Sequence, residues 1–299
     1  MPMHAGITGK TASSARRSVV AAALSPAALI VREHDRDRYQ TALFAPQAER
    51  EALFALYAFN YEIARVRESV REPMLGRIRL QWWREAVDAA YREGAPRRHE
   101  VVVPLTAAIR AYGLSRDHFT RLIDARERDL DEAPPPTLAA LEDYAEASSA
   151  PLVALALEAL GAATPPALAA AVPVGIAYAL TGLIRAMSAQ VRAGRLTIPD
   201  DIAAATGLAA SDCAALRTTP ALRTAVERIA RTASGRLKAA RAMRPGLPRR
   251  ALPALLPARV AGLALKRLER AGFDPFSGAG ESDPLQSWRL AFAAMTGRF

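Results

Sequence analysis

The sequence predicts an all-α protein, and three observations support this prediction. Alanine and leucine dominate the 299 residues, with few β-branched runs, a composition typical of helical proteins. Apolar residues recur at helical spacing along nearly the whole chain. No segment shows the alternating pattern of a half-buried strand. Because 51% of the residues are hydrophobic and no repeat or Gly/Ser-rich linker divides the chain, we expect one domain over residues 31–299.

Start and stop signals divide this domain into helices. Prolines fit the first turn of a helix, Ser115 and Thr137 can act as N-caps, and Gly94, Gly113 and Gly161 follow helix ends. Pro134–Pro136 interrupt the chain between two helices. We therefore expect helices over residues 46–70, 73–93, 101–112, 115–133, 137–160, 173–191, 211–215, 220–243 and 253–270, with short ones after Pro199 and around Trp288.

The N-terminal segment, residues 1–30, has a basic composition without acidic residues. It contains Lys10, Arg16 and Arg17 among serines and alanines. Two interpretations fit this tail: a mitochondrial targeting segment, or a disordered bacterial tail. They place the protein either on the matrix side of a mitochondrion or in a bacterial cytoplasm, where membrane association is possible. A secretory signal is excluded because no long apolar run follows the arginines.

The charge balance is strongly basic, with a net charge of +10 and a pI of about 10.4. The arginines are scattered through amphipathic helices between acidic residues, and no nucleic-acid recognition motif accompanies them. We therefore expect no nucleic-acid partner, while a peripheral contact with an anionic membrane stays open. A single cysteine excludes an intrachain disulfide, and the four histidines lack the spacing of metal ligands.

A long uncharged stretch runs from Ala159 to Ile184. It is long enough for a transmembrane helix, but Pro165, Pro166 and Pro173 interrupt it. We expect a loop followed by a helix that begins near Pro173 and is buried in a helical bundle.

The helix expected over residues 46–70 has one apolar face and one mixed face. The apolar face, typical of a core contact, holds Phe59, Ile63, Val66 and Val70. The mixed face, typical of a cavity wall, holds Tyr57, Asn60 or Tyr61, Ala64 and Glu68.

Three segments together resemble the squalene/phytoene synthase family. They are "DRYQTALFAPQAEREALFALYAFNYEIARVRESV", "RLQWWREAVDAAY" and "GLIRAMSAQVRAGRLTIPDD". The resemblance extends over residues 32–272. It implies an all-α isoprenoid-synthase fold around a central cavity. Enzymes of this family join two prenyl diphosphates head to head, and two DxxxD patterns on facing helices hold Mg²⁺ against the diphosphate.

Most of the implied metal-binding acids are missing here. The first pair falls on Ala64 and Glu68, and the second on Ala186 and Gln190, so one carboxylate of four remains. A methyl group cannot bind a cation, and an amide is a poor substitute for a carboxylate at such a site. The resemblance therefore implies no catalytic residue, no metal ligand and no cofactor, with Mg²⁺ required only if the protein is an altered enzyme.

Basic and aromatic residues of the same motifs remain candidates for binding an anion or another ligand. Arg185 and Arg195 match basic positions of the second motif, and guanidinium groups pair well with phosphate. Tyr57 and Tyr61 lie on the expected cavity wall.

Other residues outside the motifs suit structural roles better than chemical ones. Asp124, Glu127 and Asp131 share a helical face, but Arg126 and Arg128 alternate with them, which is typical of a solvated face. Trp82 and Trp83 are expected to anchor the core.

Two further segments resemble one branch of the family more specifically. "ALYAFNYEIARVRESVREPMLGRIRLQWWREAVDAAY" and "LIDARERDLDE" look like the branch that contains a mitochondrial assembly factor for respiratory complex I and its bacterial relatives. The resemblance implies a non-catalytic protein that acts in complex I assembly or handles an isoprenoid or other lipid. Complex I subunits or assembly proteins are then the implied partners. The alternative is an active prenyltransferase that uses Glu68 in an altered metal site.

Overall fold

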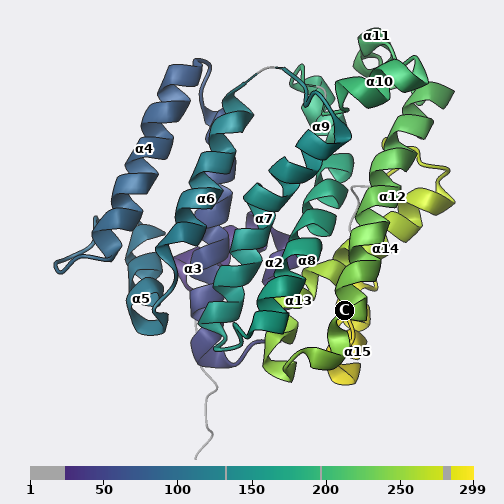
Figure 1. Ribbon diagram of the computed structural model, residues 1–299. Coiled ribbons are helices and arrows are strands. Elements are labelled where there is room, and N and C mark those ends of the chain that lie inside the picture. Colours follow the sequence, from purple (N-terminus) through teal and green to yellow (C-terminus); the bar gives the residue numbers. More distant parts are fainter. Residues whose placement is uncertain (1–23, 132, 196, 279–283) are drawn as a thin grey trace, which may run out of the picture.

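The computed structural model describes residues 24–131, 133–195, 197–278 and 284–299, and all regular elements in these ranges are helical (Figure 1). This confirms the predicted fold class. The helices are α1 Pro26–His34, α2 Arg36–Ala42, α3 Gln47–Ala64, α4 Pro73–Ala90, α5 Val102–Tyr112, α6 Arg116–Glu127, α7 Leu138–Ala159, α8 Pro165–Arg185, α9 Met187–Arg192, α10 Asp200–Thr206, α11 Ala210–Ala214, α12 Pro220–Ala242, α13 Leu252–Leu255, α14 Pro257–Arg270 and α15 Gln286–Thr296.

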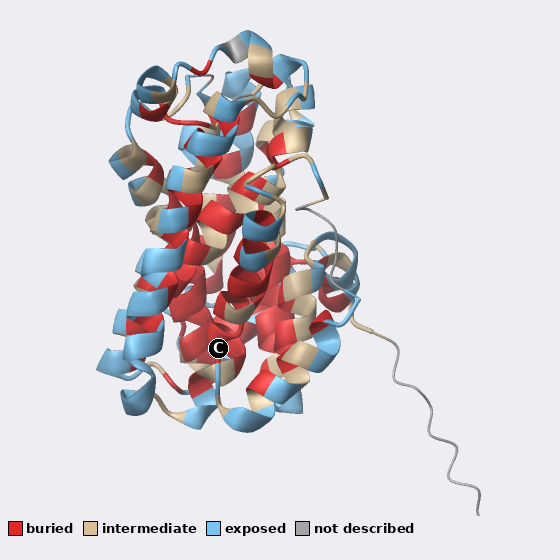
Figure 2. Cartoon of the chain, turned by 90° about the vertical axis from the view of Figure 1, so that its right-hand side faces the viewer, coloured by how far each residue is buried: buried red, intermediate tan, exposed pale blue. Residues whose placement is uncertain are grey.

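The antiparallel pair α7 and α8 forms the centre of the bundle. Helices α12 and α14 pack on α8, while α3 and α6 pack on α7, and α4 lies on the outer side of α6 (Figure 1). Buried residues follow the inner faces of these helices and exposed residues the outer faces (Figure 2). Many buried positions in α7 and α8 are alanines, and small side chains let two helix axes approach closely.

Helix α8 begins eight residues before the expected start at Pro173, so the prediction of a loop over residues 165–172 is wrong. Pro165 and Pro166 occupy the first turn, where a missing N–H is harmless, and the Thr164 hydroxyl accepts a hydrogen bond from the Ala167 N–H. Pro173 lies inside the helix. The helix is long and apolar enough to cross a membrane by length and composition, but 61% of its most apolar window is buried between other helices.

Gly175 marks the closest approach of α8 to α7. A Cβ atom at this position would lie 2.6 Å from the backbone N and Cα of Ala150. Gly182, two turns later on α8, has no other atom within 4 Å of such a Cβ. The two glycines therefore serve different purposes, and only Gly175 is required by packing.

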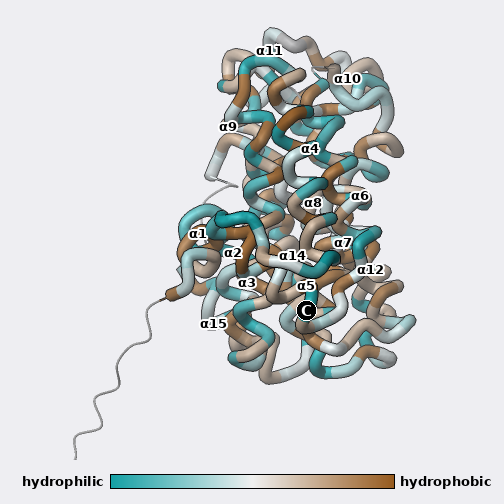
Figure 3. Tube along the Cα trace, turned by 90° about the vertical axis from the view of Figure 1, so that its left-hand side faces the viewer, coloured by the Kyte–Doolittle hydropathy of each residue, from teal (hydrophilic) through white to brown (hydrophobic). Residues whose placement is uncertain are grey.

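The N-terminal helices α1 and α2 lie against the flank of the bundle (Figure 3). Ser25 caps α1 by accepting a hydrogen bond from the Ala28 N–H, and Ala27, Ala28 and Val31 are buried. The packed domain thus includes residues from Pro26 onward, earlier than the expected boundary at residue 31. Residues 1–23, which make up most of the predicted basic tail, lie outside the described residues.

A buried arginine at the candidate functional site

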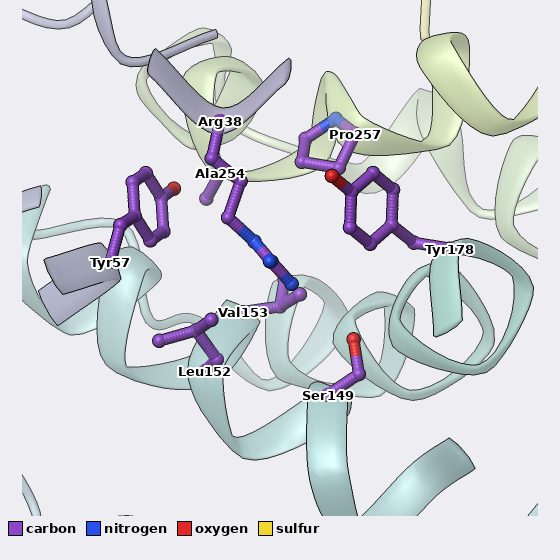
Figure 4. Close-up of a pocket in the computed structure, with 8 residues that line it drawn as sticks. All are labelled: Arg38, Tyr57, Ser149, Leu152, Val153, Tyr178, Ala254 and Pro257. Carbon is purple, nitrogen blue, oxygen red and sulfur yellow. The ribbon is translucent and has the colours of Figure 1, made fainter. Parts of the chain in front are cut away.

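Arg38 occupies the centre of the bundle, where the family resemblance implies a cavity. It extends from α2 between Tyr57 of α3 and Tyr178 of α8 (Figure 4). Its guanidinium carbon lies 4.5 Å from the ring centroid of Tyr178 and 5.7 Å from that of Tyr57. Only 9% of the residue is exposed. Arg38 is not among the candidate residues that the sequence indicates. Its buried position between two tyrosines is seen only in the structure.

Asp35 supplies the negative charge that Arg38 needs in this buried place. Its Oδ2 atom accepts a hydrogen bond from Arg38 Nη1 at 2.7 Å, and its Oδ1 atom caps α2 by accepting from the Arg38 backbone N–H at 3.1 Å. One carboxylate therefore both starts the helix and neutralises the cation. Burial alone lowers the pKa of Arg38. Asp35 and the two tyrosines raise it by more than burial lowers it, so the net shift of the pKa is upward.

The two tyrosines beside Arg38 stay neutral. Burial raises the pKa of Tyr57 and of Tyr178 above the usual value of a tyrosine, and neighbouring Asp35 acts in the same direction. Both rings therefore offer their uncharged π-faces to the guanidinium, the arrangement of a cation–π contact.

Little empty space remains at this centre. The cavity has a volume of ≈ 10 Å³ and is lined by Arg38, Tyr57, Ser149, Leu152, Val153, Tyr178, Ala254 and Pro257. That is room for about one water molecule, far below the roughly 300–1,000 Å³ of typical ligand pockets. The Ser149 hydroxyl is buried there without a hydrogen-bond partner, so a single water would satisfy it.

Arg185 forms a second ion pair with α2, through Asp37, the residue next to Arg38. Its Nη1 atom lies 2.6 Å from Asp37 Oδ2, and Gln286 Nε2 donates to the other oxygen of Asp37, also at 2.6 Å. Burial lowers the pKa of Arg185, but Asp37 raises it overall. Arg185, a candidate for binding an anionic ligand, is thus already paired with a carboxylate of the chain itself.

The first degenerate motif lies at a helix end. Helix α3 ends at Ala64 and not near Val70 as expected, and Glu68 follows in a single 3₁₀ turn over Arg67–Ser69. Phe59, Ile63 and Val66 of the predicted core face are buried, but Val70, which follows the 3₁₀ turn, is only half-buried. Glu68 is exposed over 72% of its side chain and lies 3.8 Å from Arg195 Nη2. The structure therefore turns the remaining carboxylate toward an arginine.

The second degenerate motif lies at the junction between α8 and α9. Ala186 interrupts the helix that was expected to be continuous over residues 173–191, and Gln190 follows one turn later. The Gln190 side-chain oxygen accepts a hydrogen bond from the Thr197 hydroxyl at 2.7 Å. This amide closes the loop after α9 and offers no carboxylate oxygen.

These residues do not fit a magnesium ion. Mg²⁺ requires carboxylate or other oxygen ligands in near-octahedral geometry, whereas two of the four positions carry methyl groups and the other two side chains pair within the chain. Among the residues that the structure describes, no group of three His, Cys, Asp or Glu side chains is placed to hold a metal ion.

The two candidate tyrosines have different surroundings. Tyr57 lines the small central cavity, as expected. Tyr61 instead stacks on His34 of α1, with the ring centroids 4.3 Å apart, and Arg65 lies 5.4 Å from its centroid. The structure thus brings Tyr57 together with Arg38, and Arg195 together with Glu68, but it does not join all the candidates in one pocket.

The acidic face of α6 is a solvated, ion-paired surface. Arg84 of α4 contacts both Asp124 and Glu127, and its Nη2 atom lies 2.6 Å from Glu127 Oε1. The side chains of both acids are about half exposed, so the interpretation of this face as a charged surface is confirmed.

A second, open pocket lies between the end of α3 and α4. Its volume is ≈ 320 Å³, and it is lined by Glu62, Arg65, Val66, Ser69, Arg79, Trp82, Trp83 and His99. Trp83 is buried as a core anchor should be, but Trp82 is only partly buried and faces this pocket. Glu62, Arg65 and Ser69 follow one another at helical spacing, and the packing of α4 makes them one wall of this pocket.

Comparison with known proteins places this geometry in a family. The profile described as "Squalene/phytoene synthase" matches residues 31–294, which is most of the chain. The chain therefore belongs to the squalene/phytoene synthase family. Its relatives include complex I assembly factor 6 from Bos taurus, 32% identical over 83% of this chain and 74% of that protein, and from Homo sapiens, 30% identical over 88% and 81%. These relatives confirm the predicted branch.

Enzymes of the family are more distant. A presqualene diphosphate synthase from Sinorhizobium fredii is 29% identical over 56% of this chain and 59% of that protein. Among solved structures, a dehydrosqualene synthase in complex with ligand aligns with a TM-score of 0.79 at 16% identity, covering 91% of this chain and 94% of that one. Squalene synthase HpnC from Alicyclobacillus acidocaldarius aligns with a TM-score of 0.73 at 20% identity, covering 83% and 94%. At these identities the alignments establish the fold.

Proposed function

We propose that this protein is a non-catalytic member of the squalene/phytoene synthase family that acts in the assembly of respiratory complex I. The observation that carries the proposal is the state of the two motifs. Ala64 and Ala186 replace metal-binding acids, while Glu68 and Gln190 pair with residues of the chain itself. We infer the assembly role from the relatives at 30–32% identity, which are named complex I assembly factor 6. Its partners are then complex I subunits or assembly proteins.

The filled centre of the bundle favours a protein-binding role over the handling of an isoprenoid. A prenyl chain needs an apolar pocket of the volume that ligand sites usually have. The ≈ 10 Å³ beside Arg38 is far too small, and the ≈ 320 Å³ pocket between α3 and α4 is open and lined mostly by polar and charged side chains. The same lack of space at the centre argues against an enzyme that binds two prenyl diphosphates there. The proposed role needs no Mg²⁺ or other cofactor. It places the protein on the matrix side of a mitochondrion or in the bacterial cytoplasm.

Deletion of the gene in its source cells tests the assembly role. We expect the deletion to lower the amount of assembled complex I, measured on native gels and as NADH:ubiquinone oxidoreductase activity of membranes. A plasmid copy should restore both. Unchanged complex I in the deleted strain would contradict the proposal, and a loss of hopanoid, carotenoid or squalene products would favour a prenyltransferase.

The Glu68→Ala variant separates the proposed role from an altered enzyme. The variant should restore complex I as well as the native chain does, because Glu68 makes only an exposed ion pair with Arg195. For the same reason its free energy of unfolding should fall by no more than about 1 kcal/mol. The purified native protein should release no diphosphate from farnesyl diphosphate with Mg²⁺. Diphosphate release that depends on Glu68 would establish the alternative.

A further inference from the structure

The open pocket between the end of α3 and α4 is separate from the centre of the bundle. Helix α4 forms the outer edge of the bundle (Figure 1). The pocket volume of ≈ 320 Å³ is near the lower end of the usual range for small-molecule sites. None of the described residues lines both this pocket and the cavity beside Arg38, and none of the four degenerate motif positions lines it. Its chemistry therefore comes from other residues.

Arg79 of α4 brings a positive charge to this pocket that no carboxylate of the described residues neutralises. Its Nη1 atom donates to the Ser69 hydroxyl, and Ser69 Oγ in turn donates to the Val66 carbonyl at 2.8 Å. The hydroxyl is therefore fully used by the chain itself. A guanidinium group is always charged in proteins and carries five N–H donors. Most of the donors of Arg79 are left for water or a ligand.

The acids around the pocket are matched by other arginines. Glu62, the acid in the lining, lies 3.3 Å from Arg65 Nη1. Glu85, one turn after Trp82 on α4, accepts a hydrogen bond from Arg97 Nη2 at 2.9 Å. The remaining acids of the adjoining segments are exposed and lie outside the lining: Glu68, Glu72, Glu93 and Glu100. The charge of Arg79 is therefore left over in the pocket.

Trp82 and His99 form an aromatic wall of the pocket. Their ring centroids lie 5.5 Å apart, and Trp82 is only partly buried. His99 Nδ1 accepts a hydrogen bond from the Val101 N–H at 3.1 Å, which places the proton of the neutral imidazole on Nε2. The wall thus offers an aromatic surface for stacking and one further N–H donor.

We propose that this pocket binds a phosphate monoester that carries a flat ring, which is the chemistry of a nucleoside monophosphate. Arg79 pairs with the phosphate group, His99 donates to it through Nε2–H, and the ring stacks on Trp82. Donors on both α4 and the segment before α5 suit a tetrahedral phosphate better than a planar carboxylate, which one arginine binds in its own plane. The proposal is independent of the role in complex I assembly.

The test is a calorimetric titration of the full chain with four probes: AMP, adenosine, inorganic phosphate and benzoate. AMP carries both the ring and the phosphate, whereas adenosine and inorganic phosphate each carry one of them. Because joined groups bind together more tightly than either group alone, we expect AMP to bind about tenfold or more tighter than each half. Benzoate, a ring with a carboxylate, should bind more weakly than AMP.

Two variants assign the two halves of the ligand to their residues. Arg79→Met should weaken the binding of AMP and of inorganic phosphate by about tenfold or more, because a charged hydrogen-bond donor is lost. Trp82→Leu should weaken the binding of AMP by about fivefold or more and leave that of inorganic phosphate unchanged, because only stacking is lost. Arg79 is exposed and bonds only to a hydroxyl, so the thermal unfolding of its variant should stay unchanged.

The chain offers a matched control for each variant. Arg77→Met removes the same charge from an exposed position of α4 that does not line the pocket. Trp288→Leu removes a tryptophan from α15, where it is 75% exposed. Both variants should bind AMP within about twofold of the native chain.

Three results would overturn the proposal. The native chain shows no measurable binding of AMP at millimolar concentration. Adenosine or benzoate binds as tightly as AMP, so the phosphate is not recognised. Arg77→Met weakens the binding of AMP as much as Arg79→Met does, which would reduce the effect to the overall positive charge of the domain.

Discussion

Arg38→Ala should lower the free energy of unfolding by about 3 to 5 kcal/mol, the usual cost of removing one partner of a buried ion pair. The change leaves Asp35 without its cation and removes the side chain that fills the space between Tyr57 and Tyr178. For a domain of ordinary stability this is a large fraction of the total. Chemical denaturation followed by circular dichroism measures it.

One further variant is a control on the same helix, and a second separates the loss of charge from the loss of packing at Arg38. Arg36→Ala, two residues earlier on the same helix and exposed, should change the free energy of unfolding by less than about 0.5 kcal/mol. The double variant Asp35→Asn, Arg38→Met should recover most of the loss, because asparagine still caps α2 and methionine fills similar space without a charge. A double variant as unstable as Arg38→Ala would show that the cation itself is required.

Gly175→Ala should destabilise the protein by about 1 to 3 kcal/mol or more, because the added methyl group collides with the backbone of Ala150. Backbone atoms cannot rotate away as a side chain can, so α7 and α8 must move apart along their whole contact. The same denaturation measurement applies.

Gly182→Ala is the matched control on the same helix. The added methyl group meets no atom within 4 Å, so the gain in helix propensity should raise the stability by up to about 1 kcal/mol. If both variants were equally destabilised, the close contact at Gly175 would not be the cause.

The sequence predicted α7 and α12 well because each carries local start signals, whereas no helix was expected over α1 and α2. Helix α12 begins at Pro220, as expected of a proline in the first turn, and α7 begins after the expected cap Thr137. Both signals are local, so they can be read from the sequence without knowing which segments pack together.

The start of α8 and the role of Arg38 show where local reading fails. Prolines normally argue against a helix, but Thr164 and the first-turn positions of Pro165 and Pro166 make them compatible with one. Arg38 looks like any surface arginine of an amphipathic helix. Only the contact with Tyr178, 140 residues away in the sequence, shows that it is buried.

The degenerate motif was found from the sequence, but the fate of its residues was not. The pattern identified Ala64, Glu68, Ala186 and Gln190 as positions of lost acids, which is a statement about residue types. That Glu68 pairs with Arg195, and Arg185 with Asp37, depends on how distant helices meet. Charge compensation across such distances leaves no periodic signal in one sequence.

The contacts of Asp37 have a consequence for synthesis on the ribosome. This residue of α2 receives hydrogen bonds from Arg185 and from Gln286, which lie 148 and 249 positions further along the chain. At about 5 to 20 residues per second, the ribosome needs roughly 12 to 50 s to deliver the last of these partners. Until then the Asp37 carboxylate lacks at least one of its two hydrogen-bond donors, so the contacts of α2 are completed only after α15 has been made.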